Sequence, residues 1–165
     1  MSFLNILKDK IFIKNNFFPL ILVVIIFFID RISKNKIIEH HMNGSNMFVN
    51  DYLNYILVWN TGIGFGLFSL DANIFYHILT TVIFFILIVL VYLIIKSKIV
   101  DKIFFSLILG GALGNFCDRA IYFAVPDFID IHYNDYHWFT FNIADIFISL
   151  GIILLLAKDL IIEKK

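Results

Sequence analysis

The sequence predicts an all-α membrane bundle of four transmembrane helices with a small extracytoplasmic β-sheet element. Apolar residues make up 61% of the 165 residues and charged residues only 16%, against about 25% charged in soluble domains. The mean hydropathy of +0.90 agrees with this composition. Four apolar stretches approach the roughly 20 residues that cross a bilayer. We expect one integral membrane domain over residues 1–165, because no internal repeat or domain-sized linker divides the chain.

The four predicted spans occupy about residues 17–32, 74–95, 103–117 and 141–157. The first resembles a signal peptide, but no small-residue cleavage site follows it, so we expect the chain to retain it. The second has His77 as its only strongly polar side chain. The third contains Gly110 and Gly114, a G-x-x-x-G spacing that favours close packing of helices.

The basic residues predict how the spans are oriented. With four spans, both ends of the chain and the link between the second and third spans lie on one side. Nine of the 13 basic residues are found there: Lys8, Lys10, Lys14, Lys96, Lys98, Lys102, Lys158, Lys164 and Lys165. By the positive-inside rule, that side is cytoplasmic. We therefore expect both termini in the cytoplasm and residues 36–72 and 126–140 on the outer side.

The two outer segments carry residue patterns typical of β-strands. Residues 52–59 are rich in aromatic and β-branched side chains, which favour a strand. Residues 128–133 and 136–141 predict a hairpin around Asn134 and Asp135. Aromatic side chains are common at membrane surfaces, so we expect these strands to form a small sheet on the outer surface.

Polar side chains inside the spans are the first candidates for function. An Asp at the centre of a span costs roughly 2.5–3.5 kcal/mol on insertion scales. Polar residues nevertheless gather at the outer ends of the predicted spans: Asp30, Asn115, Asp118, Arg119, Asn142 and Asp145. Helical spacing puts Asn115 and Asp118 on one face of the third span, and Asn142 and Asp145 on one face of the fourth. We expect these faces to meet, with Asp127 folding back toward them.

Two of the acids have a basic residue near them in sequence. Asp118 with Arg119, and Asp30 with Lys34, are therefore open to a structural interpretation as ion pairs, the usual way in which membrane proteins tolerate such charges. Both pairs are equally open to a functional role.

Asp127 and Asp145 have no such partner in the sequence. An unpaired buried carboxylate is expensive, so we interpret these two acids as functional.

Other polar residues carry weaker signals. The histidines on the outer side could bind a metal, but they lack a zinc-type spacing, so we expect no metal site: His40, His41, His132 and His137. Cys117 lacks a nearby histidine and fits a small buried residue better than a nucleophile. A net charge of zero, without a basic stripe, argues against a nucleic-acid partner.

Four blocks of the sequence resemble the lipoprotein signal peptidase (signal peptidase II) family. Residues 30–34 (DRISK) resemble D-x-x-[ST]-K, and residues 60–65 (NTGIGF) resemble N-x-G-x-x-F. Residues 110–119 (GGALGNFCDR) resemble G-G-A-x-G-N-x-x-D-R and lead into residues 125–130 (VPDFID), similar to V-x-D-F. Residues 141–145 (FNIAD) resemble F-N-x-A-D. The blocks occur in the family's order and cover nearly the whole chain.

The resemblance implies an aspartyl endopeptidase with Asp127 and Asp145 as its catalytic pair and no metal or cofactor. The enzyme would remove the signal peptide of a prolipoprotein just before a cysteine that carries a diacylglyceryl group. Its location would be the bacterial cytoplasmic (inner) membrane, with membrane lipid around it and the active site near the outer face. Seven further residues would bind substrate or support the pair: Asp30, Asn60, Gly62, Asn115, Asp118, Arg119 and Asn142.

The main alternative is a small membrane transporter or proton conductor that uses the buried acids as a relay. A relay requires polar residues through the whole depth of the membrane, whereas the second predicted span is almost purely apolar. A purely structural membrane subunit is a third interpretation, which the cost of so many buried acids disfavours.

Overall fold

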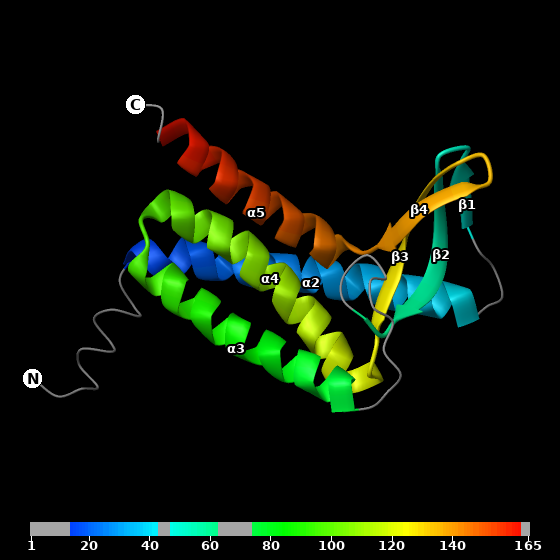
Figure 1. Cartoon of the computed structure of the whole chain (residues 1–165), viewed down its shortest axis with the longest axis horizontal. Coiled ribbons are helices and arrows are strands. Elements are labelled where there is room, and N and C mark those ends of the chain that lie inside the picture. Colours follow the sequence, from blue (N-terminus) through cyan, green and yellow to red (C-terminus); the bar gives the residue numbers. More distant parts are fainter. Residues whose placement is uncertain (1–13, 43–46, 63–73, 163–165) are drawn as a thin grey trace, which may run out of the picture.

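The computed structural model describes residues 14–42, 47–62 and 74–162. These ranges form four helices and four strands, in the order α2 (Lys14–Met42), β1 (Met47–Asn50), β2 (Leu53–Asn60), α3 (Ile74–Lys96), α4 (Ile99–Tyr122), β3 (Val125–Tyr133), β4 (Tyr136–Phe141) and α5 (Ile143–Ile162). Figure 1 shows the helices along the long axis of the molecule and the sheet at one end. The start of α2 and the end of α5 lie at the opposite end.

Helices α2, α3 and α4 are long and apolar enough to cross a membrane. Many of their large apolar side chains are exposed, among them Phe28 on α2 and Phe85 and Val89 on α3. Such faces would be unfavourable in water, so lipid must cover them. Helix α5 has 20 residues, with Asp145 near its start and Lys158 and Asp159 near its end, and it is not among these three candidate spans.

The helices differ from the predicted spans mainly at their ends. Helix α2 continues to Met42, whereas the first span was expected to end near residue 32. The reason is that Asp30, Arg31 and Lys34 form ion pairs within the protein and do not end the helix. Helix α4 continues past the expected end at residue 117 to Tyr122, because its polar residues also find partners inside the bundle.

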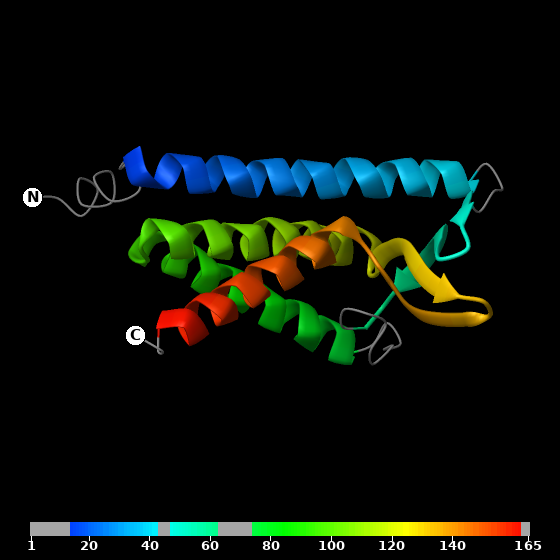
Figure 2. The ribbon, with the colours of Figure 1, turned by 90° about the horizontal axis from the view of Figure 1, so that it is seen from above.

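Helix α4 packs against the three other described helices, and Figure 2 shows α2 lying along it. Small residues allow this close approach. A methyl group added to Gly110 would lie 2.8 Å from the Cβ of Ile26, and one added to Gly114 would collide with the carboxylate of Asp30. The predicted role of the G-x-x-x-G spacing in helix packing is therefore confirmed, with α2 as the partner helix.

The strands form one antiparallel sheet in the order β1-β2-β3-β4. The predicted strand at residues 52–59 and the predicted hairpin are both confirmed. Asn134 in the hairpin turn has a φ of 50°, a left-handed conformation that Asn tolerates better than most residues. Strand β1 was not predicted, because four residues give too short a pattern.

Some of the sequence-based expectations fall outside the described residues. They concern the glycines that follow Gly62 and most of the basic residues near the two ends of the chain: Gly64, Gly66, Lys8, Lys10, Lys164 and Lys165.

Candidate active site

Helix α5 begins with a reciprocal cap that holds Asp145. The backbone N–H of Asp145 donates to Oδ1 of Asn142 at 3.0 Å, and the backbone N–H of Asn142 donates to Oδ2 of Asp145 at 3.2 Å. This is the geometry of a capping box, with Asn at the cap position and an acid three residues later. The F-N-x-A-D block therefore places the Asp145 carboxylate at the buried start of the helix by local contacts alone.

Asp127 reaches the same place from strand β3. Its carboxylate is 1% exposed and accepts two amide hydrogen bonds, from Nδ2 of Asn60 at 2.8 Å and from Nδ2 of Asn142 at 2.6 Å. Asn142 thus binds both acids. Burial, followed by the nearby charge of Asp145, raises the pKa of Asp127 to about 7. At neutral pH the pair is therefore poised to hold a proton.

Asn115 connects the pair to a buried lysine. Its Nδ2 donates to Oδ1 of Asp145 at 2.8 Å, while its Oδ1 accepts a hydrogen bond from Nζ of Lys34 at 2.7 Å. The amide of Asn115 is consequently fixed in one orientation. Because Asp145 accepts this hydrogen bond, its carboxylate is fixed relative to α4 as well as to the start of α5.

Lys34 lies at the centre of an ion-pair network between α2 and α4. Its Nζ is 2.7 Å from Asp30 Oδ2 and 2.8 Å from Asp118 Oδ2, and all three side chains are fully buried. Arg31 also pairs with Asp118. The free carboxylate oxygen of Asp30 accepts a hydrogen bond from the backbone N–H of Ala144 at 2.9 Å. The network therefore ties α2, α4 and the start of α5 together.

The sequence analysis suggested two ion pairs. The one between Asp30 and Lys34 forms in the structure, whereas the prediction of a pair between Asp118 and Arg119 is wrong. Adjacent residues of a helix point in different directions, so Asp118 faces α2 and Arg119 does not. Nη2 of Arg119 instead donates to the backbone carbonyl of Gly62 at 2.6 Å. The backbone N–H of Gly62 in turn donates to Oδ1 of Asn60 at 2.9 Å.

The sequence analysis missed two ion pairs of this network. Lys34 was assigned only a pairing with Asp30, and Arg31 was assigned no partner, yet both contact Asp118 across the helix interface. The i, i+4 spacing of Asp30 and Lys34 gave a signal for the local pair. No local pattern identifies the α4 residue that faces them.

An apolar groove leads away from Asp145 between α3, α4 and α5. It encloses about 510 Å³, and its polar lining residues are Asn115, Arg119, Asp145 and Ser149. The rest of its wall is almost entirely aliphatic, with residues such as Ile86 and Ile152. The site thus combines a polar end, where the acids lie, with an apolar channel along the bundle.

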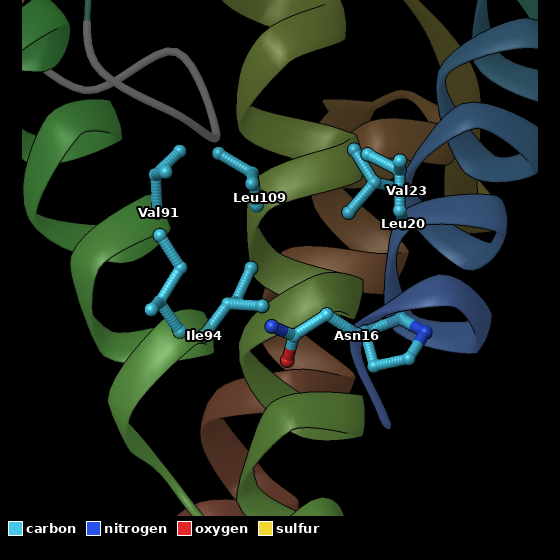
Figure 3. Close-up of a pocket in the computed structure, with 8 residues that line it drawn as sticks. Asn16, Leu20, Val23, Val91, Ile94 and Leu109 are labelled. Atoms are coloured by element: carbon cyan, nitrogen blue, oxygen red, sulfur yellow. The ribbon is translucent and has the colours of Figure 1, made fainter. Parts of the chain in front are cut away.

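A smaller pocket of about 160 Å³ lies between α2, α3 and α4. Figure 3 shows its lining, in which Asn16 faces the aliphatic side chains Val23, Val91, Ile94 and Leu109. None of the predicted site residues lines it, so it is separate from the candidate active site.

Comparison with known protein families identifies the family of this chain. The family model described as signal peptidase (SPase) II matches residues 22–161, a range that contains both acids and their described hydrogen-bond partners Asn60, Asn115 and Asn142. The chain belongs to the signal peptidase II family. The family resemblance inferred from the four blocks is confirmed, and with it the expected activity of a signal peptidase.

Individual signal peptidase II relatives match over nearly the whole chain. The lipoprotein signal peptidase of Pelagibacter ubique (strain HTCC1062) is 40% identical over 159 residues, covering 95% of this chain and 96% of the relative. That of Francisella tularensis subsp. mediasiatica (strain FSC147) is 39% identical over 166 residues, covering 98% and 99%. The transporter alternative finds no support among these relatives.

A solved structure of a bacterial membrane enzyme, determined by the in meso method at 2.3 Å resolution, has the same fold. Its sequence is 34% identical, its TM-score is 0.71, and the match covers 86% of this chain and 87% of that one. Together with the membrane-spanning helices, this similarity makes the signal peptidase a multi-pass protein of the bacterial inner membrane.

Proposed function

We propose that this signal peptidase is an aspartyl endopeptidase in which Asp127 and Asp145 are the catalytic pair. The observation that carries the proposal is that Asn142 binds both buried carboxylates, while the pKa of Asp127 is raised to about 7. Two neighbouring carboxyl groups cannot easily both ionise, so the pair shares one proton. This shared proton is what general acid–base hydrolysis of a peptide bond requires.

The reaction follows from that protonation state. The ionised member of the pair takes a proton from a water molecule as the water attacks the scissile carbonyl carbon. The protonated member donates its proton to the carbonyl oxygen as the carbon becomes tetrahedral. Proton transfer to the amide nitrogen then breaks the C–N bond and releases the new amine. The amide groups of Asn60, Asn115 and Asn142 hold the carboxylates in place throughout.

The substrate that fits this site is a prolipoprotein whose cysteine carries a diacylglyceryl group, and cleavage falls just before that cysteine. The apolar groove that reaches Asp145 supports this assignment. A lipid chain within it would be stabilised by about 0.8 kcal/mol for each buried CH₂. Seated there, the lipid holds the adjoining peptide bond at the depth of the two acids. Arg119, at the polar end of the groove, fits a role in positioning the substrate.

We further propose that α5 is the fourth transmembrane helix and that both termini are cytoplasmic. Helix α5 lies beside α4 in the bundle, and its only charged residues are at its two ends. The basic link between α3 and α4 supports this orientation. In this arrangement the sheet and the two acids lie near the outer face, where exported precursors emerge.

The requirement for lipid is the test of the proposed activity. Purified protein in detergent would be given one precursor with a diacylglyceryl-modified cysteine and the same precursor without the modification. We expect the lipidated precursor to be cut at least tenfold faster, measured as kcat/KM, because only its lipid fills the groove. Equal rates on the two precursors would contradict the assigned substrate. They would indicate a peptidase that ignores the lipid.

A further inference from the structure

Three side chains of types that can bind a metal ion meet on the β3–β4 hairpin. The carboxylate of Asp130 and one ring nitrogen each of His132 and His137 all lie within 4.8 Å of one another. Asp130 is three residues after Asp127 on β3, or about 10 Å along an extended strand. We propose that these three side chains form a binding site for Zn²⁺, separate from the catalytic pair and independent of the peptidase activity.

The sheet register explains why the three side chains converge. Asp130 and His132 are two residues apart on β3, so they point to the same face of the sheet. His132 lies directly opposite His137 on β4, and the two imidazole rings stack with centroids 5.2 Å apart. A register shift between Asp130 and His132 brings the carboxylate of Asp130 beside His137.

The contacts within the cluster leave one buried nitrogen without a partner. Nδ1 of His137 is 2.8 Å from Oδ2 of Asp130, a normal hydrogen bond. Nδ1 of His132 is 3.7 Å from the same oxygen and has no hydrogen-bond partner, although its side chain is only 9% exposed. A buried polar atom of this kind normally finds a partner.

The 3.7 Å separation fits a shared cation better than a hydrogen bond. With zinc–ligand bonds of about 2.0–2.1 Å, two ligand atoms of a tetrahedral Zn²⁺ lie about 3.3 Å apart. A Zn²⁺ ion between Asp130 and His132 would satisfy the unpartnered nitrogen. Asp130 is 1% exposed, and the positive charge of the ion would compensate its buried carboxylate.

A second unsatisfied atom lies next to the cluster. Asn54 on β2 is the cross-strand partner of Asp130, so its side chain shares the same face of the sheet. Its Oδ1 is buried and has no hydrogen-bond partner. Amide oxygens and ordered water are both acceptable additional groups around a metal ion held by two histidines and a carboxylate.

The exposed ring of His137 gives a metal ion access to the cluster from solvent. Its side chain is 54% exposed, so the ring can release its hydrogen bond to Asp130 and turn toward an incoming ion. Two imidazoles and one carboxylate are a zinc ligand set that leaves a fourth position open. A bound ion would fasten β4 to β3, the strand that carries Asp127. The site therefore gives the hairpin a metal-dependent clamp.

Zinc titration of the purified full-length protein in detergent tests the proposal. We expect isothermal titration calorimetry to give one Zn²⁺ per chain. The substitutions His132→Gln and His137→Gln should each weaken binding at least tenfold. Zinc should also raise the unfolding temperature of the unmodified protein, because a ligand of the folded state stabilises it, and a chelator should reverse that shift. His137→Gln is the safer variant for folding, since His137 is the exposed member of the cluster.

The matched control is the double substitution His40→Gln, His41→Gln near the end of α2, which removes two histidines outside the cluster. This variant should bind Zn²⁺ as tightly as the unmodified protein. The proposal is overturned if the unmodified protein shows no saturable binding of one Zn²⁺. It is equally overturned if folded His137→Gln, judged by its circular dichroism spectrum, keeps full affinity, or if the control variant loses it.

Discussion

Asn142 contacts both acids of the candidate active site. Its backbone and carboxamide oxygen form the cap with Asp145, and its Nδ2 donates to Asp127. One residue thereby fixes two acids that are far apart in sequence. The geometry required for a shared proton rests on this small amide, which is fully buried.

At this scale, the first prediction concerns the two acids themselves. Asp127→Asn and Asp145→Asn keep size and polarity but remove an ionisable group. If the acids act as one unit, each substitution should reduce cleavage by at least about 10³-fold, and the double variant should be hardly slower than either single one. The measurement is turnover of a lipidated precursor by purified variants, normalised to folded protein.

The matched control is Asp51→Asn in the exposed turn between β1 and β2, which should leave turnover within about twofold, as expected for an exposed residue outside the site. Substantial residual activity in folded Asp127→Asn or Asp145→Asn would exclude these residues as the catalytic pair.

A second prediction at the residue scale concerns pH. Burial and the charge of Asp145 raise the pKa of Asp127 to about 7. The shared proton is therefore present below that pH and is lost as the pH rises through it. We expect kcat/KM to fall with increasing pH above about 7, the limb set by loss of an essential acid. A pH profile with a lipidated precursor checks this, and a rate that stays constant from about pH 6 to 9 would contradict it.

The raised pKa of Asp127 also makes the stability of the fold depend on pH. A carboxyl group whose pKa is higher in the folded than in the unfolded chain favours folding while protonated. The contribution of Asp127 is therefore fully present below the ordinary value of 3.8 and declines as the pH rises toward about 7. Buried acids thus make the site costly to maintain in its ionised form, a cost that the surrounding amides offset only in part.

Among the secondary-structure elements, the interface between α2 and α4 decides whether the site forms. Every charged contact of Lys34 and Arg31 crosses it or lies beside it. Gly110 and Gly114 allow the two helices to approach closely enough for these contacts. The glycines therefore support the active site without touching a reacting group.

The prediction at this scale is that Gly110→Val separates α2 from α4. The new side chain would meet Ile26, and even a single methyl group would lie 3.1 Å from the backbone carbonyl oxygen of Val23. Overpacking of this kind costs about 1–3 kcal/mol. Thermal unfolding in detergent should show a lowered unfolding temperature together with reduced cleavage.

Ala120→Val is the control on the same helix, because Ala120 is exposed and gains the same branched side chain without a collision. Equal unfolding temperatures for the Gly110 and Ala120 variants would show that close packing at Gly110 is not required.

Across the whole molecule, many apolar side chains lie on the outside and many charged and amide side chains lie in the interior. The helix surfaces carry exposed apolar side chains, whereas the interior near the sheet holds charged and amide groups that satisfy one another. This distribution keeps the acids at one end of the bundle, next to the sheet. The proposed orientation then determines whether the acids meet exported precursors or face the cytoplasm.

The last prediction tests that orientation. In a Cys117→Ala background, a single cysteine at position 98, in the exposed link between α3 and α4, should resist labelling from outside intact cells. A cysteine at position 135, in the exposed turn of the hairpin, should be labelled readily and serves as the matched positive control. The physical reason is that basic links are retained in the cytoplasm. Efficient outside labelling at position 98 would reverse the topology.

The sequence by itself determined the membrane environment, the approximate positions of the helices, the hairpin and the family. These properties depend on local composition, apolar length and short motifs, all of which are linear along the chain. The capping of α5 by Asn142 is of the same kind, since its two partners are three residues apart. The sequence analysis placed Asn142 and Asp145 on one face of the fourth span but did not predict the cap; it singled out Asp145 because no basic partner lies near it.

Only the tertiary structure decided which polar groups meet across the helices. Asp118 pairs with Lys34 and Arg31 and not with its neighbour Arg119, because helix geometry turns adjacent side chains apart. Similarly, the convergence of Asp130, His132 and His137 depends on a register shift that no spacing rule reveals. Contacts between distant segments arise from packing and register, and these are set by the whole fold rather than by any local stretch of sequence.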